Sequence, residues 1–167
     1  MSNDDAEERA NGSMYLTSSD LELVYDKSDQ VVGMRFNNIN INQGTTITKA
    51  YIQFQADERN SGATYLTIQG QNTNNAGTFS GTTYNISSRL LTDSYVLWLP
   101  PPWNKIGLAG PDQRTPEIAP IIQEIINRPD WVNGNSLVIV IRGGGERTAE
   151  AYNGVASAAP LLHLEFE

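Results

Sequence analysis

The stretch that decides the fold is Ala50-Tyr51-Ile52-Gln53-Phe54-Gln55-Ala56-Asp57, in which apolar and polar side chains alternate without a break. Successive side chains of a β-strand point to opposite faces, so this alternation predicts a strand with one buried and one exposed face. The apolar face consists of Ala50, Ile52, Phe54 and Ala56, and the polar face consists of Tyr51, Gln53, Gln55 and Asp57. We therefore expect this strand to lie on a hydrophobic core.

The same period of two recurs on both sides of this strand. It occurs at 20–25, 32–36, 65–71 and 161–166, and the segment 137–141 is apolar on both faces. At 20–25 we expect Leu21, Leu23 and Tyr25 to share the inward face. Short alternating strands separated by turn residues are typical of an antiparallel sandwich. The sequence predicts an all-β fold, an antiparallel β-sandwich of the jelly-roll kind, with one core. Because the chain has 167 residues, we expect a single domain over 1–167.

One segment departs from the strand pattern. Isoleucines at 118, 121, 122, 125 and 126 have the spacing of one helical face. Thr115 suits the cap of such a helix, Pro116 its first position and Glu117 the positive end of its dipole. We expect one short helix over 116–127, about three turns long.

Composition excludes several kinds of partner. The 11 Lys and Arg against 19 Asp and Glu leave a net charge of −8, which suits neither nucleic acid nor an anionic membrane. There are no cysteines, and no apolar run is long enough to span a membrane. The start lacks the features of a signal peptide. Richness in Thr, Asn, Gly, Ser and Gln favours an extracellular module, a monomer attached to other domains of a longer secreted chain.

The chain has no recognisable catalytic motif. Its single histidine, His163, alternates within the last expected strand, and no nucleophile elbow, phosphate loop or zinc-binding helix motif occurs. A glycosidase needs only two carboxylates, so a small hydrolase or lyase stays open as an alternative. We expect a protein that is not an enzyme.

The acidic residues fall in compact groups near the ends of expected strands. Calcium binds six to eight oxygens, many of them from carboxylates, so these groups predict a structural calcium site. The candidate ligands are Asp4, Asp5, Glu7, Asp20, Glu22, Asp57 and Glu150. We expect the acids at 4–8 to be ordered and to lie near 147–152, because the first and last strands of a jelly roll are neighbours. The alternative is a set of solvated acids, some paired with Arg35 or Arg147.

Aromatic residues indicate where a glycan could bind, because sugar rings stack on aromatic faces. One candidate site lies at the loops and uses Trp98, Trp103 and Trp131, of which Trp103, beside a proline run, is expected to be the most exposed. The other is a sheet face, formed if the strands at 50–57 and 65–71 pair. It would carry Tyr51, Gln53, Gln55, Tyr65 and Gln69. Core tryptophans and an ordinary solvated sheet face are the structural alternatives.

Several segments together resemble a known family. They are Ser-Asp-Leu-Glu-Leu (19–23), Val-Gly-Met-Arg-Phe (32–36), Ala-Tyr-Ile-Gln-Phe-Gln-Ala-Asp-Glu (50–58), Ile-Ile-Gln-Glu-Ile (121–125) and Arg-Thr-Ala-Glu-Ala-Tyr (147–152). Taken over nearly the whole chain, they are similar in plan to bacterial jelly-roll carbohydrate-binding modules, including the DNRLRE type, although that literal signature does not occur. The resemblance implies a non-catalytic module with a structural calcium, attached to an enzyme or surface protein.

These observations lead to one function hypothesis and one principal alternative. The leading hypothesis is a non-catalytic carbohydrate-binding module that binds a polysaccharide. The alternative is a structural or adhesive extracellular module whose partner is a protein.

Overall fold

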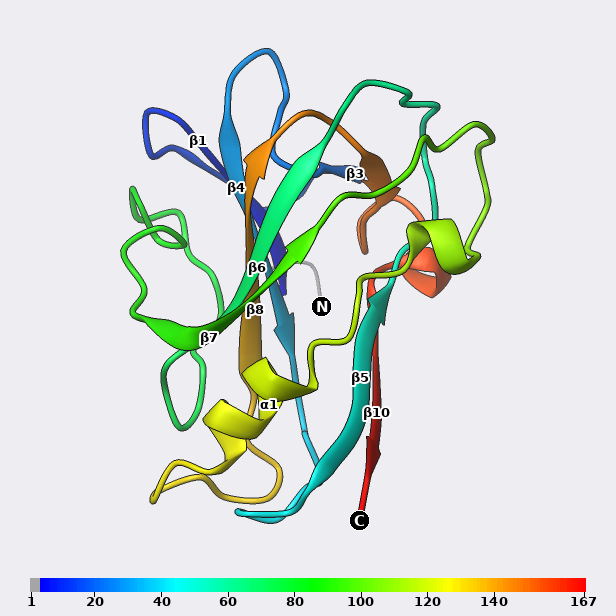
Figure 1. Ribbon diagram of the computed structural model, residues 1–167. Helices are drawn as coiled ribbons and strands as arrows, with labels where there is room; N and C mark the ends of the chain where they lie inside the picture. Colours follow the sequence, from blue (N-terminus) through cyan, green and yellow to red (C-terminus); the bar gives the residue numbers. More distant parts are fainter. Residues whose placement is uncertain (1–3) are drawn as a thin grey trace.

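The computed structural model describes residues 4–167, and its largest element is a six-stranded antiparallel sheet (Figure 1). Its strands lie in the order β2-β1-β4-β8-β6-β7. Their bounds are β1 Asp5–Arg9, β2 Met14–Tyr15, β4 Gln30–Phe36, β6 Tyr65–Gln71, β7 Leu91–Trp98 and β8 Leu137–Gly144. β8 is buried on both faces, as its unbroken apolar sequence predicts.

The second layer consists of two antiparallel pairs. β5 (Ile47–Gln53) pairs with β10 (Leu161–Phe166), and β3 (Asp20–Glu22) pairs with β9 (Thr148–Glu150). Side chains of both layers meet in one core, where Ile52 and Phe54 join Ile68 and Ile139. The predicted fold class, an all-β antiparallel sandwich with one short α-helix, is confirmed.

The alternation that defines β5 is reproduced residue by residue in the structure. Ala50, Ile52, Phe54 and Ala56 are all fully buried. The burial of a side chain the size of Ile or Phe contributes roughly 1.5–3 kcal/mol, so this face alone stabilises the second layer strongly.

The helix α1 spans Ala119–Ile126 and contacts β5, β6 and β7. All five isoleucines of the predicted face are fully buried, but the expected start at Pro116 is wrong. The preceding residues instead extend along the outer edge of β5, where Thr115 Oγ1 accepts from Ile52 N and Glu117 Oε1 from Ala50 N. Satisfying the amides of β5 outweighs an extra helical turn there.

A second hydrophobic cluster lies on the outer face of the large sheet, where one core was expected. The Gly- and Asn-rich segment 72–90 folds over that face and buries Phe79 and Ile86 against Val138 and Val140. Phe79 approaches so closely that a Cβ at Gly33 would lie 2.6 Å from its ring. This cover accounts for the apolar character of both faces of β8.

Two further helical segments among residues 4–167 are short, each a single turn. They are 3-10 helices at Pro111–Gln113 and Ala156–Ala158. Within residues 4–167, no helix is long and apolar enough to cross a membrane.

Candidate functional site

The three tryptophans do not form an exposed binding site. Trp103 is completely buried and Trp98 and Trp131 nearly so, which makes the predicted exposure of Trp103 wrong. The Trp103 indole N–H donates to Asp112 O at 2.9 Å, and its ring packs against Phe54. Its neighbouring prolines hold the chain against the core instead of lifting the ring away from it.

The predicted sheet-face site does not form either, because its two strands belong to different sheets. β5 pairs with β10, whereas β6 pairs with β7 and β8. Tyr51 stacks on His163 with centroids 4.5 Å apart and lies 4.2 Å from the Arg114 guanidinium.

Two of the three glutamines of that predicted face already have side-chain partners within the protein. Gln53 Nε2 donates to Gly110 O, and Gln69 Nε2 donates to Thr92 O. Gln55 is half-buried, and its backbone carbonyl accepts a hydrogen bond from Glu150 N. Of the predicted aromatic ligands, Tyr65 alone keeps a strongly exposed ring, with 63% of the residue accessible.

Tyr65 borders a concave surface of about 550 Å³ that we call the loop-end groove. It is lined by Tyr25, Asp29, Arg59, Asn60, Ser61, Gly62, Ala63, Tyr65, Gly144, Gly145 and Glu146. These residues come from the turn between β3 and β4, the segment before β6 and the turn after β8, which meet at the upper end in Figure 1. The volume lies in the range of small-molecule sites, and the lining combines two aromatic residues, Tyr25 and Tyr65, with polar and charged ones.

Tyr25 reaches the groove because β3 ends earlier than its sequence pattern predicts. The alternation places Tyr25 inward with Leu21 and Leu23, but the strand stops at Glu22 and the prediction for Tyr25 is wrong. Val24 takes a φ of +77°, which is unusual for a β-branched residue, and reverses the chain. Tyr25 then pairs with Asp29 across a tight turn, and 41% of it stays exposed.

Tyr65 lies flat at the start of β6 because its neighbour on β8 is a glycine. The strand register places Tyr65 opposite Gly144. A Cβ at Gly144 would lie 2.4 Å from the Tyr65 hydroxyl oxygen, so any other residue would displace the ring. The glycine run in the sequence therefore makes room for an aromatic platform.

Arg147 and Trp103 hold the loops of the groove from beneath. The fully buried Arg147 guanidinium donates to Pro100 O and Pro101 O, and also to Gly62 O and Thr64 Oγ1. Trp103 exchanges two backbone hydrogen bonds with Asn60. Arg147 thus pairs with no acidic side chain in the described part of the chain but joins segments that are distant in sequence.

The rim of the groove carries negative charge. Burial raises the pKa of Glu146 above its usual value, and the neighbouring carboxylate of Glu58 raises it further. An ionised carboxylate in this position disfavours an anionic ligand and accepts hydrogen bonds from hydroxyl groups. A protonated carboxyl can also donate one to a hydroxyl group.

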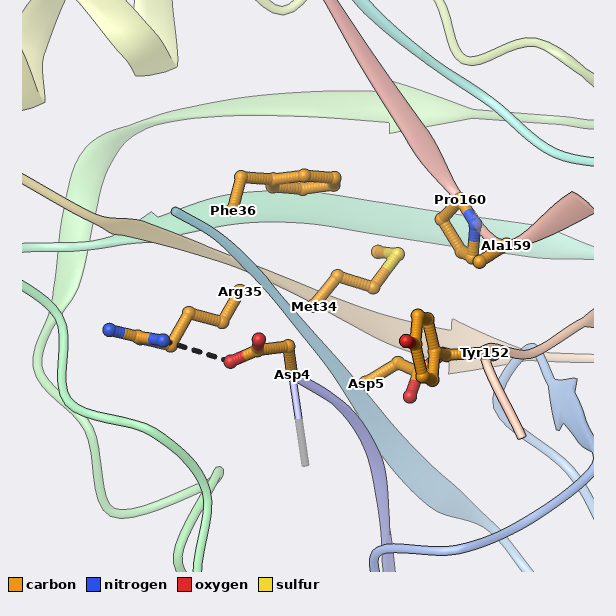
Figure 2. A pocket seen from close by; sticks show the side chains of 8 residues that line it. All are labelled: Asp4, Asp5, Met34, Arg35, Phe36, Tyr152, Ala159 and Pro160. Atoms are coloured by element: carbon orange, nitrogen blue, oxygen red, sulfur yellow. Dashed lines mark hydrogen bonds and ion pairs between the residues drawn. The ribbon is translucent and has the colours of Figure 1, made fainter. Parts of the chain in front are cut away.

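The acidic residues at 4–8 are ordered, as predicted, because β1 is paired by β2 on one side and β4 on the other. The expected neighbourhood is also confirmed: Asp5 Oδ2 accepts from Tyr152 N at 2.7 Å. Figure 2 shows Asp5 beside Tyr152. It also shows the Asp4 carboxylate turned toward the Arg35 guanidinium, and Asp4 Oδ1 lies 2.9 Å from Arg35 Nη1. Burial raises the pKa of Asp4, but the Arg35 guanidinium offsets this and holds that pKa below its ordinary value.

The buried Glu7 forms a carboxyl pair with the half-buried Glu22. Glu7 is 3% exposed, and its Oε1 accepts from Glu22 N at 2.8 Å and Gln30 Nε2 at 3.0 Å. Burial, with the adjacent Glu22 carboxyl, raises the pKa of Glu7 to about 9. Glu7 is therefore protonated at neutral pH, and a shared proton relieves the repulsion.

A third acidic group lies where β3 meets β9. The register places Asp20 opposite Glu150, and burial together with the nearby Asp57 carboxyl raises the pKa of Glu150. The seven predicted metal ligands thus separate into an Arg-paired Asp4, an amide-bound Asp5, the Glu7–Glu22 pair and this group. Over residues 4–167, no set of three or more acidic or imidazole side chains has the arrangement of a metal site.

Calcium binding stays a prediction. A site at Asp20, Asp57 and Glu150 would need backbone carbonyl oxygens or water as further ligands, because these three side chains do not by themselves form a metal site. We expect added calcium to raise the thermal midpoint of the chelator-treated wild type, because a ligand at a hundredfold excess over its Kd stabilises by about 2.7 kcal/mol. Asp57→Asn should abolish the rise. Asp5→Asn is the control and should keep it. A wild-type thermal midpoint that does not change when calcium is added would contradict the prediction.

Little in the sequence distinguishes the residues that line the loop-end groove from ordinary loop residues. Tyr25 and Asp29 belong to a polar turn, and Arg59 and Asn60 to a second turn, so each reads as an ordinary loop residue. No protein-family model matches this chain, and a comparison with curated proteins finds no significant relative.

Proposed function

We propose that this protein is a non-catalytic carbohydrate-binding module whose binding site is the loop-end groove. The observation that carries the proposal is a pair of exposed tyrosines, Tyr25 and Tyr65, on one polar concave surface. Each ring offers a flat apolar face to the C–H groups of a sugar. Asp29, Arg59 and Glu146 supply donors and acceptors for its hydroxyl groups.

The charge of the groove favours a neutral polysaccharide. Glu146 and Asp29 lie on its lining, and Arg59 is the single cationic side chain among the lining residues. The net charge of −8 adds a general repulsion toward uronic acids and sulfated sugars. Neutral chains of hexoses or pentoses meet neither obstacle.

The resemblance to secreted jelly-roll modules supports the same function. In that setting the chain is one module of a longer extracellular protein and keeps a polysaccharide near other domains. The groove is open and its loops are held by internal hydrogen bonds, which suits binding without a chemical step.

The experiment is a screen of neutral and anionic polysaccharides, followed by titration calorimetry on the best ligand. We expect Tyr65→Ala and Tyr25→Ala each to lower affinity at least tenfold, about 1.4 kcal/mol, through loss of a stacking face. Tyr95→Ala is the matched control, because Tyr95 is similarly exposed at 61% but lies on β7 outside the groove.

Three results would contradict the proposal. Binding to none of the polysaccharides would favour the structural or adhesive alternative. Equal losses for Tyr95→Ala and Tyr65→Ala would place the site elsewhere. Release of reducing sugar from the bound polysaccharide would show catalysis, and the hydrolase alternative would then replace a purely binding role.

A further inference from the structure

The last strand has an open edge in the described part of the chain. β10 pairs with β5 on one side, and no strand within residues 4–167 lies on the other. An unpaired edge presents a row of backbone donors and acceptors that can bind another strand.

The hydrogen bonds of β5 show which backbone groups of β10 are turned outward. The amides and carbonyls of Ala50 and Ile52 bond to the segment 115–118, so those of Tyr51 and Gln53 face β10. The partners of Tyr51 and Gln53 are His163 and Leu161. Because antiparallel bonding alternates along a strand, Leu162 and Leu164 direct their N–H and C=O groups to the open side.

Described residues cover the outer edge of β5 and part of the outer edge of β7. The segment 113–118 lies along β5. On β7, the Glu124 carboxylate accepts from Asp93 N and Ser94 N, both at 2.8 Å. β10 has no such cover from the described residues, and 50% of Phe166 and 66% of Leu161 are exposed.

A groove runs along this open edge, between β10 and the end of β4. It has a volume of about 420 Å³. Phe36, Ile39, Leu162 and Leu164 belong to the apolar part of its lining, and Asp4, Arg35 and Asn37 form the polar part. Figure 2 shows Phe36 and Pro160 on opposite sides of the adjoining hollow, which shares them. An added strand would lie here with alternate side chains directed toward the apolar lining.

We infer that the occupant is β10 of a second copy of this chain, so that two sandwiches join through one antiparallel strand pair. A two-fold axis at Leu164 places Leu164 opposite itself and Leu162 opposite Phe166. Both pairs then consist of residues with outward-facing backbone groups, which the antiparallel pattern requires. The pairing produces a continuous four-stranded layer, β5-β10-β10-β5.

Charge selects this register over its neighbours. With the axis at Leu164, His163 of each copy lies opposite Glu165 of the other, on the face that carries Lys49. An axis at His163 would oppose two histidines, and an axis at Glu165 two carboxylates. Opposite charges across a strand pair stabilise it and like charges destabilise it. The sequence analysis expects a monomer, whereas the open edge of β10 leads us to infer a dimer.

The first test uses the absence of cysteine from the chain, which makes cross-linking specific. We expect His163→Cys mixed with Glu165→Cys to form a disulfide-linked dimer, since directly opposite residues have Cβ atoms about 4.5–5.5 Å apart. Each variant alone should cross-link at least tenfold more slowly. Equal rates in all three samples would overturn the register.

The second test measures the molar mass by light scattering during gel filtration. The wild type and His163→Arg should both elute as dimers. His163→Glu, which opposes two carboxylates on each side, should weaken dimerisation at least tenfold. Both substitutions remove the same half-exposed imidazole, so folding effects are matched. A wild type that stays monomeric at a concentration on the order of 100 µM would overturn the inference.

The inference uses a surface separate from the loop-end groove. The protein can therefore be a monomer while the tyrosine variants still lose polysaccharide affinity. It can equally be a dimer while those variants keep their affinity, so the two proposals are tested separately.

Discussion

Arg147→Met should unfold the protein at room temperature or lower its free energy of unfolding by about 3–5 kcal/mol. The guanidinium is 1% exposed and donates to the carbonyls of Gly62, Pro100, Pro101 and Glu146 and to the Thr64 hydroxyl. Methionine fills much of the same volume but leaves these buried acceptors without a donor. Each unsatisfied group costs about 1–3 kcal/mol, less where water can enter.

Urea denaturation of Arg147→Met beside Arg142→Met would measure this effect. Arg142 donates one hydrogen bond to Ser87 O, and its buried Nε has no acceptor within residues 4–167. Its replacement should therefore cost less than about 1.5 kcal/mol. Equal destabilisation by both variants would mean that the Arg147 network does not hold the loops together.

The same network connects stability to the groove. Gly62 and Glu146 line the groove, and the backbone carbonyl oxygen of each accepts a hydrogen bond from the Arg147 guanidinium. If Arg147→Met remains folded, we expect its polysaccharide affinity to fall although Arg147 does not line the groove. Loss of affinity at a temperature where circular dichroism shows the variant to be fully folded would separate the positioning of the loops from global folding.

Glu7→Gln should make the protein more stable than the wild type in alkaline solution. The pKa of Glu7 is raised from 4.5 to about 9 by burial and by Glu22, so the folded state retains a proton that the unfolded state has lost. Stability from this group is complete below about 4.5 and is lost as the pH rises toward 9. The greatest slope is about 1.4 kcal/mol per pH unit.

Glutamine reproduces the protonated acid without titrating. Its oxygen can accept from Glu22 N and Gln30 Nε2, and its amide can donate to the Glu22 carboxylate. Between pH 6 and pH 8 the wild type should lose about 2–3 kcal/mol relative to Glu7→Gln. Urea titrations at several pH values would measure the difference between the two proteins, which cancels groups common to both.

Glu124→Gln is the control for this pH effect. Burial raises the pKa of Glu124, but hydrogen bonds from Ser94 and Asp93 outweigh it and the pKa is lowered overall. Glu124 is therefore ionised in both states between pH 6 and 8, and its replacement should leave the slope unchanged. Parallel curves for wild type and Glu7→Gln would mean that Glu7 ionises normally in the folded protein.

Local pattern predicted the faces of the strands well. The alternation at 50–57 identified the buried face of β5 correctly, and the isoleucine spacing identified the buried face of α1. Both patterns depend on backbone geometry that a few consecutive residues establish. The end of β3 was missed because the positive φ of Val24 opposes its own preference and is imposed by its surroundings.

The candidate site was predicted poorly for a physical reason. Whether Trp103 is buried depends on Asn60 and Asp112, which pair with its backbone and indole from elsewhere in the chain. The phases of β5 and β6 are the same, so the sequence allowed them to pair, yet the topology assigns them to opposite layers. Tyr65, one of the residues predicted for a glycan site, lines the loop-end groove, whereas its companion there, Tyr25, is predicted from the alternation to face the core.

The fold class and the apolar faces can be predicted from the sequence alone, because both follow from short-range alternation and from the need to bury apolar area. Tertiary structure alone decided which turns meet at the loop-end groove, which acids share a proton and which edge of the second layer stays open. These properties depend on contacts between distant segments, such as Arg147 with Pro100 and Gly62. The closure of the chain into two layers creates those contacts, and no local pattern encodes them.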